Sequence, residues 1–81
     1  MISILFFGQL RERLKTASIN LDLTATMSVE QLKHQLSERD ATFEFLFDND
    51  ILCALNETIC GPSEIVSDGD TVAFFPPVTG G

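Results

Sequence analysis

Basic residues are scarce in this sequence. Five Lys and Arg stand against twelve Asp and Glu, which gives a formal net charge of -7. A surface with this excess of negative charge repels the phosphates of nucleic acids and the anionic head groups of lipids. We therefore expect neither nucleic acid nor a membrane surface as a partner. A protein with a basic docking surface would be steered toward this chain, so the charge favours protein partners.

Trp and Tyr are absent, and the apolar segment near the start is short. Ile4 to Phe7 are too few residues for a signal-peptide core or a membrane span, and no basic region precedes them. These features predict a cytoplasmic protein without a targeting or transmembrane segment.

Metal-ligating residues are also few and scattered. The two cysteines, Cys53 and Cys60, have no His or acidic cluster beside them at the spacing of a metal site. We expect both to be reduced thiols that pack as small hydrophobic residues, and we expect no metal. Asp48-Asn49-Asp50 lacks the spacing of a calcium loop and indicates a turn, and His34 is interpreted as a solvated helix residue.

The residues that are present suit one small ordered domain. The chain has 81 residues, of which 44% are hydrophobic, and seven Phe supply bulky core material. At this size only one small core can form, so a deep cleft with its own catalytic machinery is not expected.

Alternating apolar residues predict strands at residues 2–7, 17–23, 51–55, 58–60 and 71–75. A capping-box spacing between Ser28 and Gln31 predicts a helix over residues 29–39, with Val29, Leu32 and Leu36 as its apolar stripe. Shorter helices are predicted near residues 9–15 and 42–47.

The order of these elements predicts an α+β fold. A main helix that crosses from the first pair of strands to the second, with a right-handed connection, makes the first and last strands parallel neighbours. We therefore expect a β-grasp roll, with a mixed sheet and the main helix on one face. This domain spans residues 1–75, and an extended tail spans residues 76–81.

The tail has an unusual composition. Pro76 and Pro77 fix φ and remove two amide donors, so the chain must leave the sheet in an extended form, continuing through Val78 and Thr79. Gly80 and Gly81 lack Cβ atoms and could pass through a channel too narrow for other residues. The tail is thus predicted to insert into a partner, although a frayed terminus would also contain glycine.

Three stretches carry a resemblance to a known family: residues 5–12, the turn Leu55-Asn56-Glu57-Thr58, and residues 68–81, which include Phe74-Phe75-Pro76-Pro77-Val78-Thr79-Gly80-Gly81. On these residues the chain resembles the small, sulfur-carrying subunit of molybdopterin synthase, a member of the ubiquitin-like sulfur-carrier family. The resemblance covers essentially the whole chain. It departs around residues 41–47, where a more aromatic run affects local packing.

The resemblance implies a reaction cycle centred on the Gly81 carboxylate. An adenylating activating enzyme would use ATP to form an acyl-adenylate at Gly81, and sulfur from a sulfurtransferase would displace AMP and leave a thiocarboxylate, 1-thioglycine. The large subunit of molybdopterin synthase would then accept the tail beside cyclic pyranopterin monophosphate, in a heterotetramer of two small and two large subunits. The small chain would bind no cofactor and would not be catalytic alone.

Two outward-facing aromatic residues predict a docking surface. Phe7 and Phe75 alternate with Ser3 and Thr71 on the outer side of neighbouring strands, beside the tail. The resemblance adds Ile59 to this partner interface. The alternative is that a loop of the same chain covers this face of the sheet.

Three other functions fit parts of the pattern. The sulfur carrier for thiamine thiazole synthesis shares the fold and the Gly-Gly end, but it is typically shorter and lacks the Phe-Phe-Pro-Pro sequence before the tail. A ubiquitin-like modifier would join Gly81 to lysines of other proteins. An interaction module would carry Gly-Gly by accident.

Overall fold

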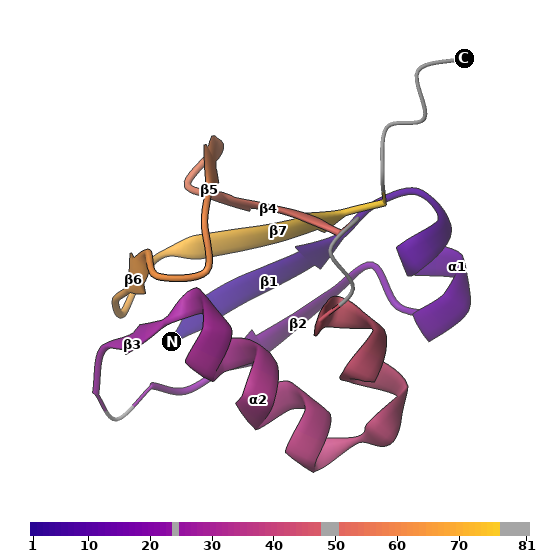
Figure 1. The fold of residues 1–81 in the computed structure, drawn as a ribbon, viewed down its shortest axis with the longest axis horizontal. Coiled ribbons are helices and arrows are strands. Elements are labelled where there is room, and N and C mark those ends of the chain that lie inside the picture. Colours follow the sequence, from indigo (N-terminus) through magenta and orange to yellow (C-terminus); the bar gives the residue numbers. More distant parts are fainter. Residues whose placement is uncertain (24, 48–50, 77–81) are drawn as a thin grey trace.

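The computed structural model describes residues 1–23, 25–47 and 51–76. A five-stranded mixed sheet lies at its centre, with the strand order β2-β1-β7-β4-β5 (Figure 1). These strands are β1 (Ile2–Phe6), β2 (Ser18–Leu21), β4 (Leu52–Leu55), β5 (Thr58–Cys60) and β7 (Thr71–Phe75). The first and last strands, β1 and β7, pair in parallel, and every other pair in this sheet is antiparallel. The predicted α+β roll with a β-grasp strand order is confirmed.

The main helix, α2 (Val29–Arg39), begins and ends where the sequence predicts. The Ser28 hydroxyl accepts the Gln31 backbone N–H at 3.1 Å, and the Ser28 N–H donates to the Gln31 side chain at 2.9 Å. This reciprocal capping satisfies two backbone donors at the start of the helix. The predicted stripe is fully buried against the inner face of the sheet, together with Ile2, Ile4 and Phe6.

Two shorter helices flank this core. The first, α1 (Gln9–Leu14), buries Leu10 and ends where Lys15 adopts a left-handed conformation with φ of 56°. The second, η1 (Ala41–Phe47), is a 3-10 helix that places Leu46 in the core. Its first turn is set by Asp40, whose carboxylate accepts the Thr42 backbone N–H at 3.0 Å. The predicted turn at residues 48–50 lies outside the described residues.

Strand lengths differ from the sequence pattern where a pairing partner is missing. The alternation of residues 17–23 predicts a seven-residue strand, but β2 stops at Leu21 because its partner there is Ile2, where β1 begins. A second, two-stranded sheet pairs β3 (Met27–Ser28) with β6 (Ile65–Val66). The sequence does not predict these two strands, because two residues are too short to show alternation.

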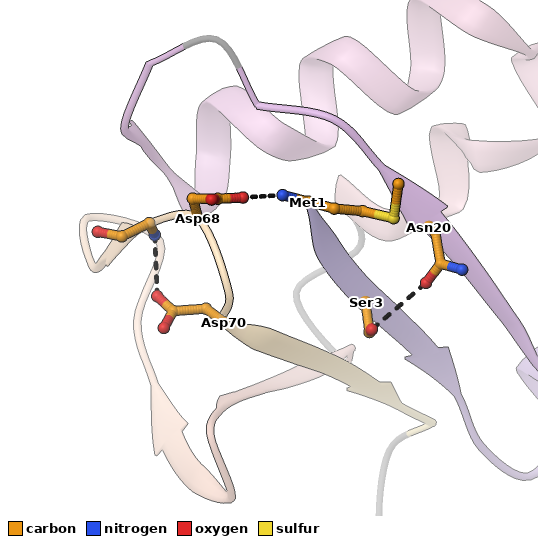
Figure 2. A network of polar contacts seen from close by, with 6 residues as sticks. Met1, Ser3, Asn20, Asp68 and Asp70 are labelled. Atoms are coloured by element: carbon orange, nitrogen blue, oxygen red, sulfur yellow. Dashed lines mark hydrogen bonds and ion pairs between the residues drawn. The ribbon is translucent and has the colours of Figure 1, made fainter.

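Hydrogen bonds at one end of the sheet hold the turns in place. The Asp70 carboxylate accepts the Ser67 backbone N–H at 2.8 Å (Figure 2) and the Asn56 side-chain amide at 3.0 Å. The bond from Asn56 is the main reason that the pKa of Asp70 lies below its ordinary value, and the bond from Ser67 lowers this pKa further. Figure 2 also shows the ion pair between the Met1 amino group and Asp68. The Asn56 bond ties the predicted tight turn at Asn56 to the residue before β7, and the ion pair ties the N-terminus to the turn at Asp68.

At the other end of the sheet, the start of α1 lies against the start of the tail. The Phe7 backbone N–H donates to the Phe74 carbonyl at 3.1 Å and extends the pairing of β1 with β7 by one bond. Gly8 follows with φ of 58° and ψ of -134°. A Cβ atom on Gly8 would lie 2.9 Å from Pro76 Cγ, so only glycine fits at this contact.

Among the described residues, no helix is both long and apolar enough to cross a membrane.

Three Gly→Ala variants should separate the effects of backbone strain and close contact at Gly8. Gly61→Ala should change the free energy of unfolding by less than about 1 kcal/mol, because open space surrounds this residue. Gly69→Ala should cost about 1 kcal/mol or more, since φ of 92° is unfavourable for alanine although nothing lies within 4 Å. Gly8→Ala should cost the most, because strain and displacement of Pro76 add together. Urea unfolding measures all three, and a Gly8→Ala variant no less stable than Gly69→Ala would contradict the close contact.

Candidate functional site

The tail begins at the centre of the sheet. Of the predicted tail residues, the structure describes Pro76, and Pro77, Val78, Thr79, Gly80 and Gly81 lie outside the described residues. Pro76 follows β7, which has β1 on one side and β4 on the other. Register pairs hold the last residues of β7 on both sides, with Phe74 opposite Phe6 and Phe75 opposite Leu52. The base of the tail is therefore fixed by two neighbouring strands and by Gly8.

Phe7 and Phe75 lie together on the outer face, as the sequence predicts. Their rings stack with centroids 5.0 Å apart and an interplanar angle of 10°. Phe7 is 42% exposed and Phe75 is half-buried. The preceding residues, Phe6 and Phe74, stack on the inner face, where both are fully buried. The pair of strands thus presents one aromatic stack to the core and another to the surface, next to the tail.

A shallow groove of about 560 Å³ runs across the outer face of the sheet from this aromatic stack. We call it the outer groove, and its lining residues are Leu5, Phe7, Ala54, Asn56, Glu57, Ile59, Thr71, Ala73 and Phe75. Its floor is low because the small residues Ala54 and Ala73 are direct cross-strand partners.

Ile59 lies on this groove with Phe7 and Phe75, which places the three predicted interface residues on one surface. Its side chain, from β5, is 65% exposed. Within the described residues, no loop of the chain covers the groove, contrary to the alternative considered from the sequence. An exposed apolar groove of this kind has the character of a protein-docking surface.

The cysteines lie opposite each other on β4 and β5. Both are free thiols, and the Cys60 thiol donates a weak hydrogen bond to Cys53 across 3.6 Å. Burial, reinforced by the bond to Cys60 and the charge that Cys60 would carry, raises the pKa of Cys53 to about 12. Cys53 is therefore a protonated core residue at neutral pH, and the predicted packing role is confirmed for it.

Other candidate ligands are dispersed through the described residues, which contain no group of three His, Cys, Asp or Glu side chains placed to hold a metal. His34 is on the exposed side of α2, as predicted, but its ring lies 4.6 Å from that of Phe47. This contact could not be predicted from the sequence, because it joins α2 to η1.

Gly8 and Asn56 are site residues whose roles sequence reasoning missed. Both belong to segments that match the family pattern, but the reason for each residue type depends on a partner far along the chain. Gly8 is needed because Pro76 lies against it. Asn56 has φ of 48° and also accepts the Thr71 backbone N–H at 2.9 Å. A left-handed turn followed by an asparagine contact to a distant strand is visible only in three dimensions.

Comparison with known proteins connects this geometry to a family. The ThiS family model matches residues 4–81. A curated protein of Escherichia coli strain K12, the molybdopterin synthase sulfur carrier subunit, is 39% identical over 83 aligned positions that cover all of both chains. The protein of the same name from Haemophilus influenzae is 35% identical over 81 positions, again covering all of both chains.

Solved structures confirm the fold. The crystal structure of SAMP1 from Haloferax volcanii matches with a TM-score of 0.83 at 22% identity, covering 99% of this chain and 98% of that one. A chain in the complex of subunits 1 and 2 of molybdopterin-converting factor from Helicobacter pylori matches with a TM-score of 0.68 at 22% identity, covering 99% and 97%. The β-grasp domain and the sequence matches lead to one conclusion: the chain belongs to the ThiS family, and two of its curated relatives are molybdopterin synthase sulfur carrier subunits.

Proposed function

We propose that this chain carries activated sulfur on the carboxylate of Gly81 and donates it in molybdenum cofactor biosynthesis. The observation that carries this proposal is the match to molybdopterin synthase sulfur carrier subunits over the full length of both chains. The family match itself runs to Gly81. The described domain supports it by supplying a fixed base for the tail and an apolar surface beside that base.

The proposed chemistry begins with activation of Gly81. A carboxylate does not react with sulfur nucleophiles, so a carboxylate oxygen first attacks the α-phosphate of ATP on an activating enzyme and releases pyrophosphate. The terminal sulfur of a persulfide on a sulfurtransferase then attacks the acyl carbon and displaces AMP, and a thiol reductant cleaves the resulting acyl disulfide to leave a thiocarboxylate. This sulfur is a nucleophile that the large subunit of molybdopterin synthase would direct onto cyclic pyranopterin monophosphate. Two carriers in turn would supply the two dithiolene sulfurs.

The described residues contribute position rather than reactivity. Pro76 is held by Gly8 and by the end of the central strand, so the distance from the domain to Gly81 is set by five residues of tail. A reaction of this kind depends on placing the carboxylate within a narrow range of distance from its partner's nucleotide or substrate. The domain thus sets the distance at which the Gly81 carboxylate reaches the partner's site.

The outer groove is the proposed contact with the large subunit. Phe7, Phe75 and Ile59 form one apolar surface that adjoins the tail, as an interface core would. The fold is shared with a chain of the Helicobacter pylori complex of subunits 1 and 2, which supports a large-subunit partner. We propose the heterotetramer of two small and two large subunits on the family resemblance alone.

Two other functions retain specific support. The family model bears the name of ThiS, which keeps the sulfur carrier for thiamine thiazole synthesis as an alternative. The fold is also that of a small archaeal modifier protein from Haloferax volcanii, which keeps a ubiquitin-like modifier as another. Conjugates of this chain that survive denaturation and reducing agent would favour the modifier.

Changing the length of the tail should abolish thiocarboxylate formation. Deleting Gly81, or adding one alanine after it, moves the carboxylate by about 3.3 Å, which exceeds the tolerance of a reacting geometry. Each variant is incubated with the activating enzyme, ATP and a sulfur source, and the mass increase for replacement of one oxygen by sulfur is measured. Thr79→Ser, which keeps the length, serves as the matched control and should be converted like the wild type. Full conversion of the extended chain would overturn the carrier function.

Phe75→Asp should weaken binding to the large subunit by about thirtyfold or more, the loss typical of an interface hot spot. The matched control is Phe47→Asp, since Phe47 is 38% exposed and lies on η1, away from the outer groove. Titration calorimetry measures binding, and circular dichroism checks the fold. Equal losses for the two folded variants would show that the groove is not the contact surface.

Replacing both Cys53 and Cys60 by alanine should leave sulfur transfer intact. The only expected cost is about 1 kcal/mol or more of stability from the buried Cys53 position. The measurement is thiocarboxylate formation by the double variant at a temperature where urea unfolding shows it to be folded. A folded double variant that accepts no sulfur would point to a cysteine persulfide as the carrier instead.

A further inference from the structure

The basic residues of this chain are concentrated in one place. Three of the five lie between residues 11 and 15, in α1 and its C-terminal cap, although the whole chain has a net charge of -7. The other two, Lys33 and Arg39, are on α2. The neighbourhood of α1 thus carries a local excess of positive charge on an otherwise acidic protein.

Arg11 and Lys15 lie on the same side of α1. Arg11 is on the helix and Lys15 is its left-handed cap, and both line a hollow of about 600 Å³ with Gly8, Glu12, Thr16 and Ala17. We call this hollow the α1 hollow. Arg13 points elsewhere, with its guanidinium 4.8 Å from the centre of the Phe45 ring. The left-handed cap fixes Lys15, because its N–H bonds back to the carbonyls of Arg11 and Glu12.

Both charges are available to a partner. Arg11 and Lys15 are exposed, and neither forms an ion pair with a carboxylate of the described residues, where the ion pair present is that of Met1 with Asp68. Glu12 lines the same hollow without pairing to either of them.

The α1 hollow adjoins both the tail and the outer groove. Gly8 lines the hollow and contacts Pro76, the first residue of the tail. Phe7, the residue before Gly8, lines the outer groove. Figure 1 shows α1 beside the end of β7, where the tail begins. A protein that engages the outer groove and accepts the tail would therefore also meet Arg11 and Lys15.

We propose that Arg11 and Lys15 bind carboxylate side chains of the large synthase subunit, as a second contact continuous with the outer groove. This inference rests on the proposed function, because it takes the tail-accepting partner from it. The chemistry is charge complementarity: an arginine fork and a lysine ammonium match Asp and Glu side chains, and they are more effective where the interface excludes water.

The contact acts on orientation and lifetime more than on encounter. The net negative charge repels acidic surfaces at long range, so two local cations cannot dominate diffusional steering. Once the partners touch, they favour the one rotation of the domain that brings carboxylates into the α1 hollow. The apolar groove alone would resist rotation less, because apolar contact is non-directional. A fixed orientation of the domain on its partner directs the tail toward the site that accepts it.

The test compares two double charge reversals. The variant Arg11→Glu with Lys15→Glu and the control Lys33→Glu with Arg39→Glu each exchange two cations for two anions, so each lowers the net charge from -7 by the same amount. The control residues lie on α2, whose apolar stripe packs on the sheet face opposite the outer groove. Surface plasmon resonance measures the Kd and koff of each folded variant for the large subunit.

The α1 variant should bind about tenfold or more weakly than the wild type, mainly through a faster koff, whereas the control should change by less than about threefold. Exchanging the two cations, as Arg11→Lys with Lys15→Arg, should keep binding near the wild-type value because both charges remain. Equal weakening by the two reversals would overturn the inference, since it would show a general charge effect.

Loss of thiocarboxylate formation by the α1 variant, with unchanged binding to the large subunit, would also overturn the inference and assign the α1 hollow to the activating enzyme. In both cases the proposed function would stand, because the wild type would still accept sulfur and bind the large subunit. A wild-type chain that does neither would overturn the proposed function, and this inference with it.

Discussion

Parallel pairing between β1 and β7 is the constraint on which the rest of this structure depends. The register that sets Ile4 opposite Val72 and Phe6 opposite Phe74 puts one aromatic stack into the core. Since side chains alternate along a strand, the same register puts Phe7 and Phe75 together on the outer face. It also brings Gly8 against Pro76. A slip of one residue would exchange the core and surface faces and misplace the tail at the same time.

The sequence predicted the parts of the fold that depend on local chemistry. The capping box marked the start of α2, and alternation assigned the inner face of β1 and β7 correctly. Order of elements and connection handedness were enough to predict the parallel pair. Strand ends were less accurate because they depend on where a neighbour stops, as Leu21 does opposite Ile2. The small sheet of β3 and β6 pairs Met27 with Val66, which are far apart along the chain, so no pattern within either strand predicts it.

The candidate site likewise combines residues that local sequence patterns predicted with residues whose roles depend on distant contacts. Alternation placed Phe7 and Phe75 on one surface, whereas Ile59 came from family resemblance, since its strand is too short to assign a face with certainty. The role of Gly8 could not be predicted, because it depends on a contact between residues 68 positions apart. The α1 hollow was in principle visible as a cluster of basic residues in an acidic chain. The sequence could not show which two of the three cations share a face with the base of the tail.

The separation of β1 and β7 along the chain also has a consequence for how the protein is made. Ser3 pairs with Thr71, so the central pair of the sheet closes a loop that contains most of the 81 residues. Contacts of this kind slow folding, because the entropy of a long loop is lost before the pairing is gained. On the ribosome, the edge of β1 that faces β7 stays unpaired until β7 has been synthesised and has left the exit tunnel, although the other edge can already pair with β2. The outer groove, which Leu5 and Phe7 line from one side and Thr71 and Phe75 from the other, therefore cannot form in a nascent chain before this pairing is made.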